Sequence, residues 1–513
     1  MKNQSFIMGA LILVIAGFIN RIIGFAYRVI VVRIVGAEGI GLYEMVFPVY
    51  IMILVLATAG IPLAISKLVS ARIAKNDPAG AYKIFKIALL FLFISGLLFS
   101  LALYFILPFL MKIAFTDPRV EIIFQTMIPA IFFISVSSAF RGYFQGLQQM
   151  MPTALTQTVE QVTRVIIGLY FAQYLLPHGL EYGVTGLAIG MVLGELMGLV
   201  AILVIFFKKR KKVPLSSKSS LSGLNILTDI FSLSIPITLT RTFATIILAL
   251  EAIILPQRLM ATGITLSETT SIYGQYSGMA LPLLVLPTII TISLAVTLVP
   301  AISEAAAQKN YFVISSRINK SIQLTILVGI PSSIVFYFWG PELTLLLFNN
   351  IDAGYILKTL AIGSIFLYLQ QTTSGILQGL GEVKAILRNS VIGGLIRLGG
   401  IYYLAAIPGY GITGALLAVN TSFIAMAFLN NISIARVTGI SIELKKNIIK
   451  PLWCGVITAA FAKLIILNLI TFENNIMNIL MTISLTLALY LCSLLIFRII
   501  NIKSLLQVLK NKW

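Results

Sequence analysis

The chain has 513 residues, of which 59% are hydrophobic and only 11% are charged, and its mean hydropathy is +1.01. Soluble globular domains do not have this balance, so the composition predicts a polytopic membrane protein. Lys and Arg outnumber Asp and Glu by 37 to 17, but cytoplasmic loops of membrane proteins are rich in Lys and Arg, so this excess does not indicate nucleic-acid binding. Two cysteines in apolar runs and a single histidine argue against disulfides, metal centres and Cys/His catalysis.

Fourteen segments are long and apolar enough to cross a bilayer, which takes about 20 residues. The first is interpreted as a membrane helix and not as a signal peptide, because its apolar run is long and lacks a small-residue cleavage site. The predicted helices of the first half are 6–34, 43–68, 85–112, 122–147, 153–176 and 183–207. Those of the second half are 227–255, 272–303, 322–348, 357–381, 385–407 and 411–435, and two more, 448–470 and 476–501, lie outside this pattern. The predicted fold class is an all-α polytopic membrane protein with two pseudo-symmetric six-helix lobes plus two C-terminal helices.

Four domains follow from these segments. They are an N-terminal lobe (1–207), a basic cytoplasmic linker (208–225), a C-terminal lobe (226–437), and helices 13 and 14 with a cytoplasmic tail (438–513). The linker begins with the run Lys208-Lys209-Arg210-Lys211-Lys212. With the N-terminus inside, most Lys and Arg fall on the cytoplasmic side, as the positive-inside bias requires. Both termini are therefore predicted to be cytoplasmic.

A duplicated stretch supports the two lobes. Phe144-Gln145-Gly146-Leu147 recurs as Leu377-Gln378-Gly379-Leu380, and Tyr182-Gly183-Val184-Thr185-Gly186-Leu187 recurs as Tyr410-Gly411-Ile412-Thr413-Gly414-Ala415. Arg164 recurs at the same spacing as Arg397. Because each half has an even number of helices, both halves enter the membrane in the same direction, and their symmetry axis should run along the membrane normal. Arg164 and Arg397 are then predicted at one depth near mid-bilayer, facing each other across the lobe interface.

Arginines within apolar segments are the main candidate functional residues. An ionised side chain at the bilayer centre costs at least about 2.5 to 3.5 kcal/mol, so it normally faces a partner, water or a ligand. The five candidates for binding the anionic part of a substrate are Arg21, Arg28, Arg241, Arg397 and Arg164. Guanidinium groups bind phosphate and carboxylate in a bidentate way, so a cavity lined by them favours an anionic, amphiphilic substrate.

Structural roles remain open for several of these arginines. Glu160 lies four residues before Arg164, so the two can pair on one helix, and Arg28 is close enough to a helix end to snorkel. Arg397 has no such acid on its helix, which favours it over Arg164 as a phosphate contact. Lys463, outside the repeat, is expected to snorkel or face lipid.

Acidic residues in apolar segments are candidates for ion coupling or for neutralising an arginine. They are Glu251, Glu44, Glu195 and Glu160. Glu251 is chosen for coupling, with a structural counter-ion as the alternative. The glycines Gly186, Gly190, Gly194 and Gly198 are expected to allow close helix packing.

The pattern of two six-helix lobes plus two helices, with arginines in the first helix of each lobe, resembles the multidrug/oligosaccharidyl-lipid/polysaccharide exporter superfamily. The stretch Gly36-Ala37-Glu38-Gly39-Ile40-Gly41-Leu42-Tyr43-Glu44, with Phe47-Pro48-Val49-Tyr50 and Ala57-Thr58-Ala59-Gly60-Ile61-Pro62, is similar to the branch of polysaccharide exporters that contains stage V sporulation protein B. The resemblance implies that Arg21, Arg28 and Arg241 hold a pyrophosphate. At Tyr27-Arg28-Val29 the chain departs from the expected arginine followed by an acid.

The function implied by the resemblance is a flippase, not an enzyme. It would move an undecaprenyl-pyrophosphate-linked glycan, such as lipid II, across the cytoplasmic membrane by alternating access, in spore cortex or cell-wall synthesis. Its partners would be membrane lipids and this glycan lipid, and no nucleic acid, cofactor or metal is expected. The protein is expected to be a monomer. Transport could be coupled to a cation gradient or to the membrane potential. One alternative is a multidrug/cation antiporter, which would need an acidic cavity. Another is a membrane glycosyl- or phosphotransferase, which should place Asp, Glu or His near a loop.

Overall fold

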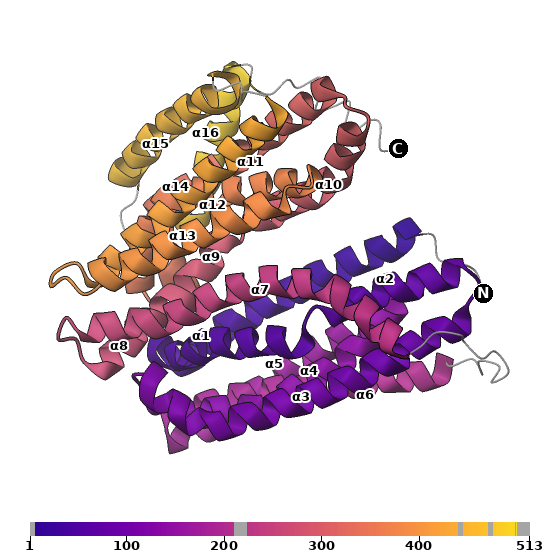
Figure 1. The fold of residues 1–513 in the computed structure, drawn as a ribbon. Helices are drawn as coiled ribbons and strands as arrows, with labels where there is room; N and C mark the ends of the chain where they lie inside the picture. Colours follow the sequence, from indigo (N-terminus) through magenta and orange to yellow (C-terminus); the bar gives the residue numbers. More distant parts are fainter. Residues whose placement is uncertain (1–5, 210–222, 440–444, 470–475, 498, 500–513) are drawn as a thin grey trace. The chain divides into compact units, whose positions relative to one another are not determined.

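The computed structural model describes residues 6–209, 223–439, 445–469, 476–497 and 499, and this part of the chain is helical without strands (Figure 1). Most of the predicted linker (210–222) and of the predicted tail (500–513) lies outside the described residues. The chain forms two compact units, one made of residues 1–257 and 265–274, the other of residues 258–264 and 275–513.

The helices of the first unit follow the predicted order but not all the predicted boundaries. They are α1 (Phe6–Thr58), α2 (Ile61–Ala74), α3 (Pro78–Ala114), α4 (Val120–Gly146), α5 (Met151–Leu175), the short η1 (Leu176–His178), α6 (Leu180–Lys209), α7 (Gly223–Met260) and α8 (Leu266–Tyr273). The last turn of α7 belongs to the second unit.

The second unit holds the remaining helices. They are the π-helical η2 (Gly274–Ala280), α9 (Leu281–Val285), α10 (Thr288–Ala307), α11 (Tyr311–Phe348), α12 (Asp352–Gly379), α13 (Val383–Leu404), α14 (Gly411–Thr438), the π-helical turn η3 (Lys445–Ile449), α15 (Lys450–Leu469) and α16 (Ile476–Ile496). Its core is an aliphatic cluster contributed by α10, α11, α12 and α14, and it includes Cys454 from α15 and Tyr490 from α16. The two helices outside the repeat therefore pack on α11.

Ten helices among the described residues are long and apolar enough to cross a membrane, so the predicted count of fourteen is not confirmed. One difference lies in α1, where the sequence predicted separate helices at 6–34 and 43–68. Between the two predicted segments the chain stays helical except at Gly36, whose φ of 71° and ψ of −173° break the axis. A left-handed residue without a Cβ changes the direction of the chain without a loop, which hydropathy does not reveal. The predicted helix 43–68 is instead interrupted at Ala59 and Gly60, where α1 ends and α2 begins.

The predicted single helix at 272–303 is likewise divided. It consists of the end of α8, the π-helical η2, the short α9 and α10, and Pro282 and Pro287 lie at the starts of the last two. Proline lacks an N–H donor, which suits it to the first turn of a helix. The segment is helical and apolar, as predicted, but the prediction of one continuous helix is wrong.

Helix α7 packs with the first unit, although the repeat would assign it to the C-terminal lobe. Ile226 and Ile230 join the hydrophobic core formed by α2, α3, α4 and α6. Phe231 contacts Phe91 of α3 edge to face, with ring centroids 5.1 Å apart. Near its other end, Gln257 donates a hydrogen bond of 2.9 Å to the carbonyl of Ala114. Helix α7 therefore runs along α3.

Helices α5 and α6 meet along the predicted glycine stripe. A Cβ added at Gly190 would lie 2.3 Å from the Cα of Gly168, and one at Gly186 would lie 2.4 Å from the backbone of Phe171. Both distances are shorter than any van der Waals contact, so only glycine allows this approach. The expectation of close packing is confirmed for these two positions.

Gly41 allows a similar approach between α1 and α8. A Cβ there would lie 2.0 Å from the carbonyl oxygen of Thr270, which is backbone and has no other rotamer. Gly41→Ala is therefore expected to lower stability by roughly 1 to 3 kcal/mol, measured as a lower Tm of the purified protein in detergent. The matched control is Gly17→Ala on the same helix, where no atom lies within 4 Å of the added Cβ. Equal Tm values for the two variants would contradict the contact.

Candidate functional site

The first predicted arginine with a partner is Arg28. Its guanidinium lies 2.9 Å from the carboxylate of Glu44, and Glu44 is only 6% exposed. Both residues belong to α1, on opposite sides of the break at Gly36. The acid that the superfamily pattern led us to expect directly after Arg28 is thus replaced by Glu44 from the far side of the break.

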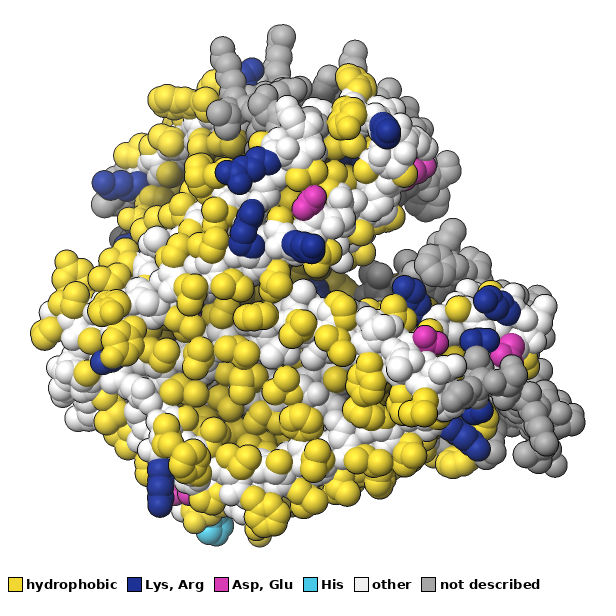
Figure 2. Space-filling view, viewed as in Figure 1, with side chains coloured by type: hydrophobic (Ala, Val, Ile, Leu, Met, Phe, Trp, Pro, Cys, Tyr) yellow, Lys and Arg dark blue, Asp and Glu magenta, His cyan; other side chains and the backbone are white. Residues whose placement is uncertain are grey.

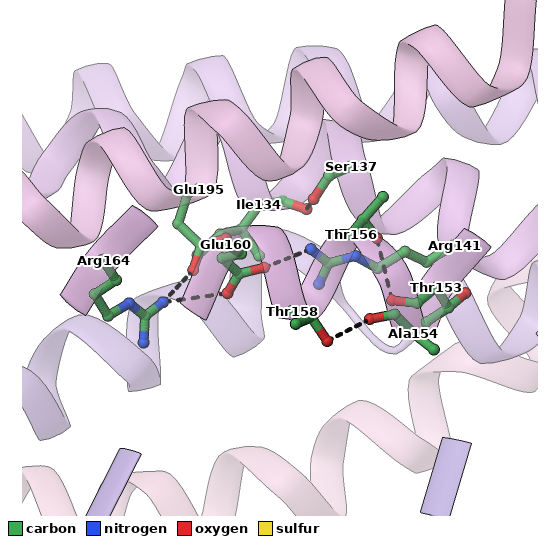
Figure 3. Close-up of polar contacts among 10 residues, drawn as sticks. All are labelled: Ile134, Ser137, Arg141, Thr153, Ala154, Thr156, Thr158, Glu160, Arg164 and Glu195. Carbon is green, nitrogen blue, oxygen red and sulfur yellow. Dashed lines mark hydrogen bonds and ion pairs between the residues drawn. The ribbon is translucent and has the colours of Figure 1, made fainter. Parts of the chain in front are cut away.

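A larger ion-pair network joins α4, α5 and α6 (Figure 3). Glu160 lies between two arginines, 2.7 Å from Arg141 and 3.2 Å from Arg164. Arg164 also pairs with Glu195 at 2.6 Å. The order Arg141, Glu160, Arg164, Glu195 alternates in charge, and the four charges sum to zero when all are ionised.

Local sequence explains this geometry. Glu160 and Arg164 are four residues apart and share one face of α5, so they meet without distortion. On α6, Gly194 faces the carbonyl of Glu160 and Gly198 faces its carboxylate, where an added Cβ would lie 2.9 Å and 3.4 Å away. These two glycines bring α6 close enough for the buried Glu195 to reach Arg164.

Arg141 was missed by the sequence analysis, although it lies inside the predicted helix 122–147. Its partner Glu160 was considered only for Arg164. The available signal was the position of Arg141 within an apolar segment, the same criterion that selected the other five arginines.

Aromatic hydroxyls of α1 lie beside this network. Tyr43 donates to the sulfur of Met191 on α6 at 3.6 Å and lies within electrostatic range of Arg28, Glu44 and Arg164. The Arg28–Glu44 pair and Arg164 therefore all act on one tyrosine side chain. Because two carboxylates engage Arg164 and one engages Arg28, neither arginine adds net positive charge at this position.

Arg21 and Arg241 differ from these two. Both side chains are exposed, and neither guanidinium forms an ion pair or hydrogen bond with a residue that the structure describes. Arg21 lies in α1 and Arg241 in α7, both within apolar stretches long enough to span a membrane. The structure does not pair them with Glu251, which is buried on α7.

Arg397 occupies the repeat position of Arg164 but has different neighbours. Its Nη2 donates to the hydroxyl of Tyr276 at 2.9 Å, and its guanidinium lies 5.9 Å from the ring centre of Phe423. At the spacing of the repeat, Gly393 replaces Glu160 and Phe423 replaces Glu195. The two carboxylates that neutralise Arg164 are thus absent from the second copy.

Tyr276 itself is the repeat counterpart of Tyr43. Gly41-Leu42-Tyr43 recurs as Gly274-Gln275-Tyr276 at the spacing of Arg164 and Arg397, but Phe47-Pro48 recurs as Leu281-Pro282 one position later. The π-helical η2 lies where this extra residue is inserted. A π-helical turn takes in more residues than an α-helical one, so it absorbs an insertion while keeping the helix direction.

A second polar cluster, which the sequence did not predict, lies next to the break in α1, at Glu38. Arg119 donates to both oxygens of Asp117 at 3.0 and 2.8 Å and to Glu38 at 2.7 Å. Thr270 of α8 donates to Asp117 at 3.0 Å. These hydrogen bonds, led by those to Asp117, raise the pKa of Arg119 above its ordinary value. The cluster ties α1 and α8 to the loop before α4.

The outer surface around these helices is apolar. Hydrophobic side chains cover most of the face drawn in Figure 2, and Lys and Arg gather in a few groups on it. Large side chains such as Phe105 and Phe109 of α3 are 75% and 66% exposed. Water would disfavour so much exposed apolar area, whereas lipid accommodates it.

Comparison with known proteins gives the family. A family model described as "Polysaccharide biosynthesis protein" matches residues 6–306, and a second model, MatE, matches residues 276–403. The chain is 33% identical to stage V sporulation protein B of Bacillus subtilis over 98% of its own length and 97% of that protein. The chain belongs to the polysaccharide biosynthesis protein family. This places it within the exporter superfamily that the sequence resembled.

Two further comparisons agree with the superfamily. The chain is 25% identical to the lipid II flippase MurJ of Bacillus subtilis, covering 86% of the chain and 85% of that protein. A solved structure of lipid II flippase MurJ in an inward closed conformation has a TM-score of 0.71 at 16% identity, covering 95% of this chain and 99% of that one. For this member of the polysaccharide biosynthesis protein family, the likeness establishes the fold of a multi-span helical membrane transporter.

Proposed function

We propose that this protein is a flippase that moves an anionic, lipid-linked glycan across the cytoplasmic membrane. The observation that carries the proposal is the exposure of the Arg21 and Arg241 side chains within apolar helices. Both lie in membrane-spanning helices, and their side chains are exposed without a partner among the described residues. A charge in such a position is stabilised by water or by an anionic ligand, and a guanidinium suits a phosphate.

The substrate class we propose is an undecaprenyl-pyrophosphate-linked glycan, such as lipid II. A pyrophosphate carries negative charge and several acceptor oxygens, which match two or more guanidinium groups. The names of the relatives support this class, since one is a lipid II flippase and another a sporulation protein. A role in spore cortex or cell-wall synthesis is part of the proposal.

Among the five predicted arginines, the contacts favour an unequal division of roles. Arg21 and Arg241 are proposed as pyrophosphate contacts, with Arg397 as a third; its described neighbours include the Tyr276 hydroxyl and the Phe423 ring. Arg164 is proposed to act mainly within its ion-pair network, and Arg28 within its pair with Glu44.

Transport is proposed to proceed without chemical change to the substrate, with both termini cytoplasmic. A cation gradient or the membrane potential is the proposed source of energy, and Glu251, buried on α7, is the proposed coupling residue. A cation antiporter is less well supported, because the buried acids Glu44 and Glu195 are already paired with arginines.

Complementation tests the proposal in cells. The protein is expected to restore growth when an essential lipid II flippase is depleted, whereas the Arg21→Ala/Arg241→Ala double variant is not. Lys463→Ala is the control, because Lys463 is an exposed basic residue of α15, outside the repeat. Growth restored equally by the double variant, at the same protein level, would refute the proposed role of these arginines.

A further inference from the structure

A groove on the second unit, whose described lining includes none of the arginines described above, gathers polar side chains at the start of α11. It has a volume of about 210 Å³ and is lined by one face of that helix and by Asn447 of the η3 turn. From α11 it is lined by Phe312, Ser315, Ser316, Asn319, Lys320 and Gln323. These positions recur every three or four residues, so they form one stripe along the helix.

The wall of the groove is built from buried amides. Asn447 is 2% exposed and Asn319 is 8% exposed. The amide of Asn447 donates to the side-chain oxygen of Asn319 at 2.6 Å, and Asn319 donates to the carbonyl of Ser315 at 3.1 Å. These bonds link η3, which leads into α15, to the first turns of α11. The polar wall is therefore held in place by its own hydrogen bonds.

Three other polar groups face the groove without such bonds. The side chains of Ser316, Lys320 and Gln323 form no hydrogen bond or ion pair with a described residue. Together they offer an ammonium, an amide and a hydroxyl donor, and the described residues that line the groove include no carboxylate. Convergent donors with one positive charge and no acid suit a phosphate group, whose oxygens only accept hydrogen bonds when ionised.

The surroundings place this groove at the edge of the membrane. Tyr311 and Phe312 are 58% and 84% exposed, and they are the first residues of α11 and of its candidate membrane span, Tyr311–Phe338. Exposed aromatic residues at the end of a spanning helix are typical of the interface between lipid and water. Lys309 and Lys450 are additional exposed basic residues at the starts of α11 and α15.

We propose that this groove is a binding site for a phosphate group, such as the headgroup of an anionic phospholipid in the adjacent leaflet. The phosphate would accept from Lys320, Gln323 and Ser316, while Phe312 at the rim contacts the acyl region. Because Asn447 belongs to the turn before α15, a bound headgroup would also hold α15 against α11. The site is separate from the proposed transport of a lipid-linked glycan.

Native mass spectrometry of the whole purified protein tests the proposal, with phosphatidylglycerol and diacylglycerol as probes. Phosphatidylglycerol is expected to remain bound preferentially. Lys320→Glu replaces a charge-assisted hydrogen bond with repulsion and is expected to weaken this binding by about tenfold or more. Gln323→Glu is a second variant with the same expectation, and Lys384→Glu is the matched control, since Lys384 is exposed on α13 outside the groove.

A titration with inorganic phosphate shows whether the bound phosphate group comes from a lipid headgroup or from a soluble compound. If millimolar phosphate raises Tm in the parent but not in Lys320→Glu, and phosphatidylglycerol does not bind, the site takes a soluble phosphate compound instead of a lipid. The proposal is overturned if Lys320→Glu and Gln323→Glu bind phosphatidylglycerol as Lys384→Glu does and respond equally to phosphate. Equal binding of phosphatidylglycerol and of diacylglycerol, which lacks the phosphate, would also overturn it.

Discussion

Arg164→Ala is expected to destabilise the protein by roughly 3 to 5 kcal/mol, the usual effect of removing one member of a buried ion pair. Arg164 contacts Glu195 at 2.6 Å and Glu160 at 3.2 Å, and Glu195 is only 4% exposed. Without the guanidinium, two carboxylates remain in a membrane-spanning bundle with Arg141 alone to balance them. We expect less folded protein in the membrane and a lower Tm in detergent.

A double variant separates the effect of the lost ion pair from the effect of the lost side-chain volume. Arg164→Leu with Glu195→Leu removes both charges and keeps apolar side chains, so it should recover much of the stability lost in Arg164→Leu alone. Arg241→Ala is the matched control, because this exposed arginine has no partner among the described residues. An Arg164→Ala protein as stable as Arg241→Ala would contradict the neutralising role of the network.

The second large effect is on transport. Arg21→Ala and Arg241→Ala are each expected to slow translocation of a lipid-linked pyrophosphate by about ten- to a hundredfold, because each loses a charge-assisted hydrogen bond. Folding should be unaffected, since neither side chain bonds to another described residue. The measurement is the initial rate of flipping in proteoliposomes at matched protein amounts.

Charge alone should restore only part of the activity. Arg241→Lys keeps the positive charge but loses the fork of donors, so its rate should fall between those of Arg241→Ala and the parent. Lys463→Ala should flip at the parental rate. If Arg21→Ala and Arg241→Ala also flipped at the parental rate, these arginines would not contact the substrate.

The sequence predicted much of the fold because hydropathy depends only on composition along the chain. The helical class and helices such as α5 and α6 follow from long apolar runs and from the repeat, whereas the family was predicted from the resemblance carried by the stretch from Gly36 to Glu44. The break at Gly36 and the division around η2 were not predicted, because hydropathy is continuous across both. The inserted residue before Leu281 becomes visible only when Gly41-Leu42-Tyr43 is aligned with Gly274-Gln275-Tyr276.

The candidate site was predicted as a set of residues but not as a set of contacts. Spacing along α5 identified Glu160 as a partner of Arg164. Spacing could not identify Glu195 or Arg141, because they lie on other helices, nor the pairing of Arg28 with Glu44 across the break in α1. Tertiary contacts of this kind depend on how helices pack, which the positions of charges in one chain do not determine.

The comparison of Arg164 with Arg397 shows how the copies diverged. The arginine is kept, as is the tyrosine at Tyr43 and Tyr276, but Glu160 and Glu195 give way to Gly393 and Phe423. In one copy the guanidinium joins carboxylates, and in the other it donates to a tyrosine hydroxyl. The duplicated arginine thus has different described contacts in the two halves.

A leaflet-accessibility assay tests the central proposal most directly. The purified protein is reconstituted into vesicles with a labelled undecaprenyl-pyrophosphate-linked glycan, and a membrane-impermeant reagent reports the fraction of label on the outer leaflet. We expect the protected fraction to fall only when the protein is present, with the lipid recovered chemically unchanged. Protection equal to that of protein-free vesicles, or recovery of a chemically altered lipid, would contradict a flippase.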